Sequence, residues 1–177
     1  MSTGLAGRGA APITALLLMG VSGCGKTTVG EALARELGWR FVDADDHHPP
    51  ANVEKMRAGR PLDDTDRAPW LARLNALLRH SAARGEPVVL ACSALKARYR
   101  AQLADRLPGL RIAHLSGSQA LIEARLADRQ HRYMPASLLA SQFAALEAPQ
   151  DAWVVEISDA PAALVATLAA RVRAEGG

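Results

Sequence analysis

The fold is decided by the stretch Gly20-Val21-Ser22-Gly23-Cys24-Gly25-Lys26-Thr27, which matches the pattern G-x-x-x-x-G-K-[ST] at every fixed position. An apolar run, Ala15 to Met19, precedes this stretch and reads as a buried strand. Apolar residues at helical spacing follow it from Val29 to Leu37. A glycine-rich turn between a strand and a helix presents backbone N–H groups to phosphate oxygens, and the helix N-terminus adds a favourable partial charge. We therefore predict a loop from Gly20 through Thr28 that binds the phosphates of a nucleotide.

Two side chains of this loop have expected roles of their own. Lys26 should reach the β- and γ-phosphates, and the Thr27 hydroxyl should hold Mg²⁺. The glycines are needed because a side chain at their positions would block the approach of the phosphates or forbid a positive φ.

A second interpretation of the same residues is a bacterial lipoprotein signal peptide. Arg8 would be its charged region, Ala10 to Met19 its apolar region, and Cys24 the residue that is lipidated after cleavage. Cleavage before Cys24 would remove the strand and half of the loop, and the interpretation explains nothing downstream. We therefore favour the phosphate-binding loop.

Length and composition limit the function classes. The 177 residues suggest one domain from about residue 13 to the end, after a disordered lead-in over residues 1–12. The net charge of +3 and the 4% of aromatic residues, with no block of basic residues, give little support to nucleic-acid binding. No apolar run reaches the roughly 18 residues of a membrane span. The two cysteines have neither zinc-ligand spacing nor a disulfide framework, which suits a reducing compartment such as the cytoplasm.

Predicted strands and helices alternate along the chain. The strands are expected at residues 15–19, 39–43, 87–92, 111–115 and 153–157. The helix that precedes the third strand should be capped by Asp64 or Thr65, with Pro69 in its first turn, and Ser118 should cap the helix after the fourth strand. This alternation predicts an α/β fold with a mainly parallel sheet and a site at the carboxyl ends of the strands.

Acidic side chains close the second predicted strand. Asp43 and Asp45 are two residues apart, so in extended backbone they would point the same way. The third strand ends without an acidic residue for Mg²⁺, and the Asp43/Asp45 pair is the best substitute. One carboxylate would serve the metal, and Asp45 would accept a proton from an attacking hydroxyl. His48 is a candidate hydrogen-bond donor to the substrate.

Basic side chains supply candidates for binding anions. Arg125 and Arg129 share a helix face just before the segment Gln130-His131-Arg132-Tyr133-Met134-Pro135, and this position suggests a mobile lid over about residues 125–140. A lid arginine over the γ-phosphate would stabilise the transition state, although a solvated surface pair is the usual fate of such arginines. An anionic substrate would need one or two of the other basic residues that lie near the site, Arg67, Lys96, Arg98 and Arg100.

Beyond the phosphate loop, three further segments resemble the bacterial-type gluconate kinases. The first runs from Asp43-Ala44-Asp45 and His48-Pro49 through Asn52, Lys55-Met56 and Gly59-Arg60-Pro61-Leu62 to Asp66-Arg67 and Pro69-Trp70-Leu71. The second is Cys92-Ser93-Ala94-Leu95-Lys96 with Tyr99-Arg100, and the third is Met134-Pro135, Leu138-Leu139, Ser141-Gln142-Phe143 and Leu146-Glu147. Together they cover most of the chain from Leu16 to Pro149.

The resemblance implies ATP- and Mg²⁺-dependent phosphorylation of D-gluconate to 6-phosphogluconate by a cytoplasmic homodimer. It also implies the three-layer P-loop kinase fold of the shikimate kinases, with a five-stranded parallel sheet and a helical lid. Parallels with those kinases place Asp45 near the acceptor hydroxyl, Arg67 near the substrate carboxylate and Arg125 and Arg129 in the lid. The residues after the fifth strand, 158–161, would border the adenine.

The chain departs from the family pattern at two places, and two other functions stay open. His131-Arg132-Tyr133 stands where Gly-His-Phe is usual, and Asp46-His47 replaces a less polar pair. The acceptor could therefore be another sugar acid, shikimate or a nucleotide. The chain could also be a nucleotide-binding switch without catalysis.

Overall fold

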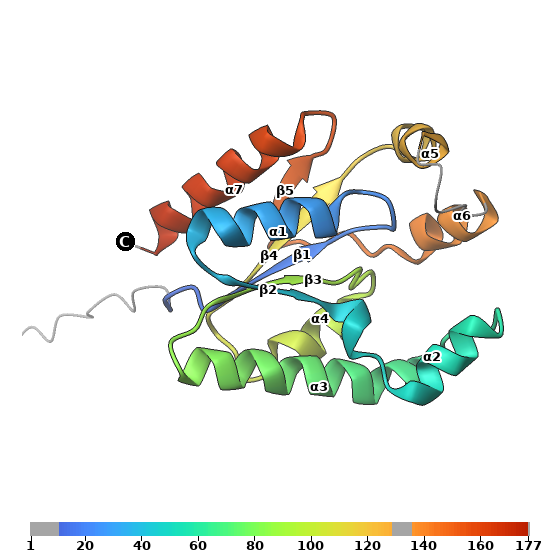
Figure 1. Cartoon of the computed structure of the whole chain (residues 1–177), viewed down its shortest axis with the longest axis horizontal. Coiled ribbons are helices and arrows are strands. Elements are labelled where there is room, and N and C mark those ends of the chain that lie inside the picture. Colours follow the sequence, from blue (N-terminus) through green and yellow to red (C-terminus); the bar gives the residue numbers. More distant parts are fainter. Residues whose placement is uncertain (1–10, 129–135, 177) are drawn as a thin grey trace, which may run out of the picture.

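A computed structural model describes residues 11–128 and 136–176, and its centre is a sheet of five parallel strands between two layers of helices (Figure 1). The strand order is β2-β3-β1-β4-β5, so the strand before the phosphate loop lies in the middle. The strands are β1 (Ala15–Met19), β2 (Arg40–Asp43), β3 (Val88–Ala91), β4 (Leu110–Ser116) and β5 (Trp153–Glu156). The predicted α/β fold with a parallel sheet is confirmed. The stretch that the lipoprotein interpretation would remove is the central strand, which argues against that interpretation.

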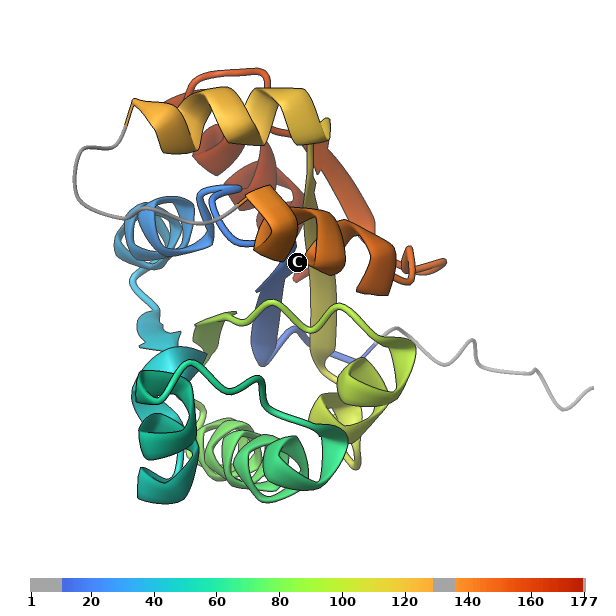
Figure 2. The ribbon, with the colours of Figure 1, turned by 90° about the vertical axis from the view of Figure 1, so that its right-hand side faces the viewer.

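Two pairs of helices cover the two faces of the sheet. On one face lie α1 (Lys26–Leu37) and α7 (Pro161–Glu175), and on the other lie α3 (Asp64–Ala83) and α4 (Ala97–Ala104). Three further helices gather at the carboxyl ends of the strands, α2 (Pro50–Arg57), α5 (Gln119–Ala127) and α6 (Ala136–Ala145), together with the 3₁₀ turn η1 (Ala44–His47) (Figure 2). The loops and short helices thus collect at one edge, where parallel α/β sheets bind ligands.

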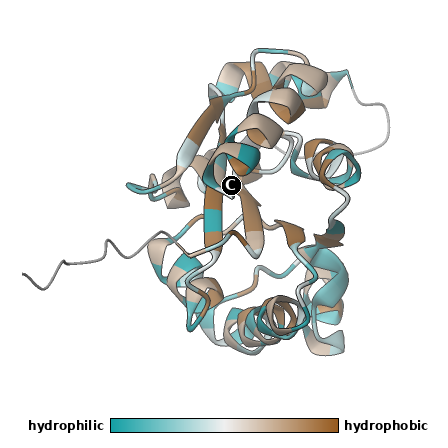
Figure 3. Ribbon diagram, turned by 90° about the vertical axis from the view of Figure 1, so that its left-hand side faces the viewer, coloured by the Kyte–Doolittle hydropathy of each residue, from teal (hydrophilic) through white to brown (hydrophobic). Residues whose placement is uncertain are grey.

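Alternation along β1 explains the two hydrophobic cores. Leu16 and Leu18 pack under α1 and α7, whereas Leu17 and Met19 pack under α3 and α4, and all four side chains are fully buried. Coloured by hydropathy, the strands form an apolar centre between more polar outer surfaces (Figure 3). A strand that is buried on both faces needs an unbroken apolar sequence, which is why this run was recognisable.

The helix ends differ in detail from the sequence prediction. The cap of α3 is Asp63, not Asp64 or Thr65: its carboxylate accepts from the Asp66 N–H, and the Asp66 carboxylate accepts from the Asp63 N–H. This reciprocal capping box satisfies two helix-end donors at once. Pro69 lies inside α3 and not in its first turn. Ser118 caps α5 as predicted, by accepting from Leu121 N–H.

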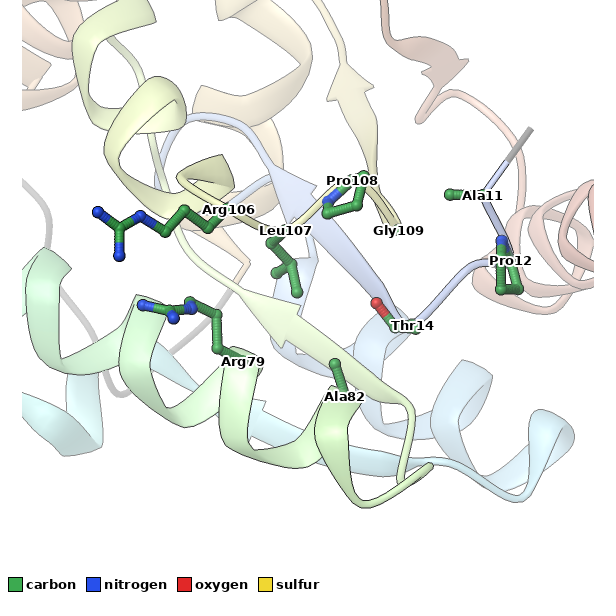
Figure 4. A pocket seen from close by; sticks show the side chains of 9 residues that line it. All are labelled: Ala11, Pro12, Thr14, Arg79, Ala82, Arg106, Leu107, Pro108 and Gly109. Atoms are coloured by element: carbon green, nitrogen blue, oxygen red, sulfur yellow. The ribbon is translucent and has the colours of Figure 1, made fainter. Parts of the chain in front are cut away.

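A hollow lies at the amino-terminal edge of the sheet, opposite the edge where the loops and short helices collect (Figure 4). It measures about 310 Å³ and is lined by Ala11, Pro12, Thr14, Arg79, Ala82, Arg106, Leu107, Pro108 and Gly109. Ala11, which the sequence assigned to the lead-in, accepts a hydrogen bond from the Arg111 side chain, so contacts with the domain begin at least here. Among the described residues, no helix combines the length and the apolar character needed to cross a membrane.

Candidate active site

The loop between β1 and α1 has the backbone that its glycines predict. Gly25 is the N-cap of α1 with φ of 99°, and no side chain caps this helix, so the first-turn N–H groups face the hollow beside the loop. A Cβ on Gly20 would lie 2.8 Å from the carbonyl oxygen of Leu115. Glycine is therefore required at both ends of the loop, by conformation at one and by close approach at the other. Open N–H groups at a helix N-terminus form an anion site.

Lys26 and Thr27 lie inside this loop. The Lys26 ammonium donates to the carbonyls of Gly20 and Val21, both at 3.0 Å, which fixes a positive charge within the curve of the loop. The Thr27 hydroxyl donates to the Asp43 carboxylate at 3.0 Å. Asp43 ends β2, so this bond joins the two segments that were predicted to hold Mg²⁺.

The second acidic residue reaches the hollow by a different route from the one expected. The backbone does not stay extended after Asp43, because η1 begins at Ala44, and the Asp43 carboxylate caps this turn by accepting from the Asp45 N–H at 3.0 Å. Asp45 nevertheless lines the same hollow as Lys26, with a side chain that is 87% exposed. The walls of the hollow displace part of its water and, with the Asp43 charge next in size, raise the pKa of Asp45 above its usual value.

His48 lies beside Asp45 but is not among the residues that line the hollow. Its ring stacks on Trp70 with centroids 4.1 Å apart, and its Nε2 lies 3.9 Å from Asp45 Oδ1. Burial lowers the pKa of His48, against the Asp45 charge, so the ring is neutral at pH 7. Asn52 Nδ2 lies 3.4 Å from His48 Nδ1, and if it donates there the ring proton sits on Nε2. Trp70 is held in turn by its own hydrogen bond to the Ala44 carbonyl at 2.8 Å.

Three cations surround the ring of Tyr99. Arg67 and Arg98 each lie 5.5 Å from the ring centroid and Lys96 lies at 5.9 Å. Arg98 is paired with Asp64, whereas Lys96 makes no ion pair with the described residues. Arg67 donates to the Leu62 carbonyl, which orients its guanidinium. Three of the four predicted anion-binding residues, Arg67, Lys96 and Arg98, are thus brought together.

Among the described basic candidates only Lys26 lines the hollow, and Arg100 and Arg125 bond to backbone carbonyls elsewhere. Arg100 is buried, with 7% of its surface exposed, and its guanidinium donates to the carbonyls of Ala94, Leu95 and Glu147. These bonds hold the segment after β3 in place and leave Arg100 no free face for a substrate, so we do not retain it as a substrate contact. Burial lowers the pKa of Arg100. Arg125 donates to the Ile157 carbonyl just after β5, and Arg129 and residues 131–133 lie outside the described residues.

The phosphate loop and the acidic end of β2 border one cleft of about 140 Å³, which is the hollow described above. Its lining comes from the phosphate loop and from the ends of β2 and β3: Ser22, Gly23, Gly25, Lys26, Thr27, Thr28, Asp43, Asp45, Ala91, Cys92 and Ser93. Burial raises the pKa of Cys92 to about 12, so its thiol stays neutral and is no nucleophile. The cleft therefore pairs a phosphate-binding backbone with a carboxylate that can orient a hydroxyl, which are the parts that phosphoryl transfer needs.

One contact to the loop was missed by the sequence analysis. Gln142 of α6 accepts a hydrogen bond from the Ser22 N–H at 2.7 Å and donates to the Ser22 hydroxyl at 2.9 Å. The residue stood in a recognised segment but had no predicted partner, because the contact spans 120 residues. No local pattern carries such a signal.

Comparisons with known proteins agree with this geometry. A model of a family described as an AAA domain matches residues 16–152. A gluconokinase from Gluconobacter oxydans (strain 621H) is 53% identical over 137 residues, which cover 77% of this chain and 76% of the relative. The crystal structure of a gluconokinase from Sinorhizobium meliloti 1021 is 38% identical and covers 94% of this chain and 100% of its own, with a TM-score of 0.79. Shikimate kinase from Acinetobacter baumannii, at 18% identity over 92% of this chain and 94% of its own, has a TM-score of 0.57 and shows the shared fold alone.

Proposed function

The chain belongs to the gluconokinase family, and from that premise we propose that it transfers the γ-phosphoryl group of ATP to the 6-hydroxyl of D-gluconate. The observation that carries this proposal is the shared cleft, in which the phosphate loop and Asp45 face each other. Asp43 and Asp45 lie at and just after the end of β2, so they reach this cleft from a different segment of the chain than the phosphate loop does.

The nucleotide side of the cleft holds the phosphates by backbone and charge. The first-turn N–H groups of α1 bind phosphate oxygens, and Lys26 adds its ammonium at the β- and γ-phosphates. The Thr27 hydroxyl and the Asp43 carboxylate fit Mg²⁺ as ligands, because both supply oxygen atoms and these lie 3.0 Å apart. No group of three His, Cys, Asp or Glu side chains that could hold a metal ion occurs within residues 11–128 and 136–176, which suits an ion held largely by phosphates and water. When bound, Mg²⁺ neutralises charge on the β- and γ-phosphates.

The acceptor side of the cleft orients the hydroxyl. Asp45 accepts the hydroxyl proton as the hydroxyl oxygen bonds to the γ-phosphorus of ATP, while the bond from that phosphorus to the bridging oxygen breaks and ADP leaves. The raised pKa makes the Asp45 carboxylate a stronger base than an ordinary aspartate. Neutral His48 donates from Nε2 to a neighbouring hydroxyl of the substrate. Arg67 and Lys96 bind the substrate carboxylate, an anion for which their grouping around Tyr99 supplies positive charge.

Several finer points belong to the same proposal. Arg125 and Arg129 act from the lid, about residues 125–140, on the phosphates, and the segment after β5 borders the adenine. One contact supports placing Arg125 near the adenine-binding segment. Its side chain donates to the carbonyl of Ile157, directly before residues 158–161. We also propose that the enzyme is a cytoplasmic homodimer with a single kinase domain, as the family resemblance implies.

An acceptor screen tests the function directly. ADP release is measured with D-gluconate, other sugar acids, shikimate and nucleoside monophosphates, each at saturating ATP and Mg²⁺. We expect turnover that depends on gluconate and is much weaker with the other acceptors. Turnover only with another acceptor would replace gluconate in the proposal, and ATP binding without transfer to any acceptor would leave a nucleotide-binding protein without kinase activity.

A further inference from the structure

Gln142 bonds to Ser22, a residue of the phosphate loop that lies before the first turn of α1. Ser22 is the third residue of the loop and lines the cleft, and both of its polar groups, the N–H and the hydroxyl, are bonded to the one amide of Gln142. A primary amide that accepts and donates to one residue at 2.7 and 2.9 Å fixes both the position and the rotation of that residue.

The helix that carries Gln142 is itself anchored on both sides of the contact. Leu139, one turn earlier, is 1% exposed and packs in the core beneath α1. Glu147, just beyond the helix, donates its N–H to the Leu95 carbonyl at 2.9 Å, and its carboxylate accepts from the Ala97 N–H at 2.6 Å. The helix that carries the Gln142 amide is therefore held by contacts on both sides of this residue.

Other contacts hold the loop on either side of Ser22 but do not reach Ser22 itself. The Cys24 side chain is buried in the core, and its N–H donates to the Val21 carbonyl at 3.3 Å. The Lys26 ammonium holds the carbonyls of Gly20 and Val21. Leu126 of α5 packs against Gly23, where an added Cβ would lie 2.9 Å from it, but this contact is apolar and sets no orientation. In Figure 2, α6 lies directly beside the loop between β1 and α1.

From these contacts we propose that Gln142 is a positioning residue, which acts through Ser22 to hold the phosphate loop in its nucleotide-binding shape. The proposal rests on the proposed use of ATP by this loop. A loop that is already ordered loses less conformational entropy when it binds phosphate, so the contact should favour nucleotide affinity and leave acceptor affinity unchanged.

The test compares Gln142→Met, which keeps the length of the side chain but loses both hydrogen bonds, with Ser141→Ala. Ser141 is the matched control because it is on the same helix, and its hydroxyl bonds only to the Leu138 carbonyl of that helix among the residues that the structure describes. We expect Gln142→Met to raise the KM for ATP and the calorimetric Kd for ADP about tenfold, the usual scale for two lost hydrogen bonds that water replaces in part. The KM for gluconate should stay within twofold, and Ser141→Ala should leave all three constants unchanged. A purely structural role would lower the Tm without this split between the two substrates, and would overturn the proposal.

A double-mutant cycle with Ser22 tests whether the two residues act together. Ser22→Ala removes one of the two bonds and should raise the Kd for ADP about threefold in the wild-type background. In the Gln142→Met background the same change should have no further effect, whereas a second threefold loss would overturn the proposal. ADP binding is measured without an acceptor, so it reports on Gln142 even if gluconate turnover fails, and the two failures can be told apart.

Discussion

The sheet carries a hollow at each end, and the two differ in what lines them. The hollow at the amino-terminal edge is about 310 Å³, more than twice the 140 Å³ of the cleft at the carboxyl-terminal edge. Its walls are mostly apolar, and its two arginines, Arg79 and Arg106, extend side by side away from the rest of the lining (Figure 4). The smaller cleft instead gathers helix N–H groups, an ammonium and two carboxylates. The convergence of polar groups of opposite charge therefore identifies the site for phosphoryl transfer, whereas the volume of a hollow does not.

The largest difference in kcat between variants of the two hollows is expected when Lys26 is replaced. Lys26→Met removes the charge that stabilises the transferring phosphoryl group and should lower kcat by about 10³-fold, the scale for losing a main electrostatic contact in the transition state. Arg79→Met, the same loss of charge at the other hollow, should leave kcat unchanged. Steady-state rates of ADP release measure both variants. Equal losses in the two would mean that the cleft is not the chemical centre.

The next effect concerns the acid at the end of β2. Asp45→Asn keeps the shape of the side chain but cannot accept a proton, and kcat should fall roughly 10²-fold or more. In the wild type the pKa of Asp45 is raised, so its carboxylate is present above that pKa and is lost as the pH falls through it. The kcat of the wild type should therefore decline on the acid side at a higher pH than an ordinary aspartate would give. The Asn variant should lack this acid limb, and a variant that keeps most of the wild-type kcat would remove Asp45 from the mechanism.

A smaller effect separates the two substrates. Lys96→Met and Arg67→Met should each raise the KM for gluconate about tenfold, because each removes a charged hydrogen bond to the carboxylate, and should leave the KM for ATP within twofold. Arg98→Met is the matched control: Arg98 packs on the same ring but is paired with Asp64, so its loss should change the KM for gluconate by less than about threefold. Initial rates with each substrate varied in turn decide between them. Equal changes in all three variants would indicate a diffuse field of charge and no specific contacts.

What the sequence could predict depended on how local each feature is. The phosphate loop and the central strand are continuous in sequence, so their residue pattern was sufficient. Asp43 and Asp45 were placed at the cleft because parallel strands end at one edge, although a 3₁₀ turn and not an extended strand brings Asp45 there. That turn depends on a bond between the Asp43 carboxylate and a backbone N–H, which periodicity does not report.

Long-range contacts explain what the sequence missed. The Arg100 guanidinium reaches a carbonyl 47 residues away, and from the sequence its burial could not be distinguished from the exposure of the nearby Arg98. Arginines that satisfy buried carbonyls and arginines that bind substrates have the same sequence signature. Only the fold separates them, since it decides which guanidinium has partners inside the protein.

The smallest effect is expected at the other hollow. The Thr14 hydroxyl is buried there and has no hydrogen-bond partner among the described residues, whereas its backbone N–H and carbonyl are both paired. Thr14→Val replaces the hydroxyl by a methyl group of similar size, and should raise the free energy of unfolding by about 1 kcal/mol because no buried donor is left unsatisfied. Thr14→Ser, which keeps the hydroxyl and loses the methyl, should lower it, and neither variant should change kcat. Urea unfolding and ADP-release rates on the same samples measure both quantities. A less stable Val variant would mean that the hydroxyl has a partner, and a lower kcat would mean that this end of the sheet is coupled to the cleft after all.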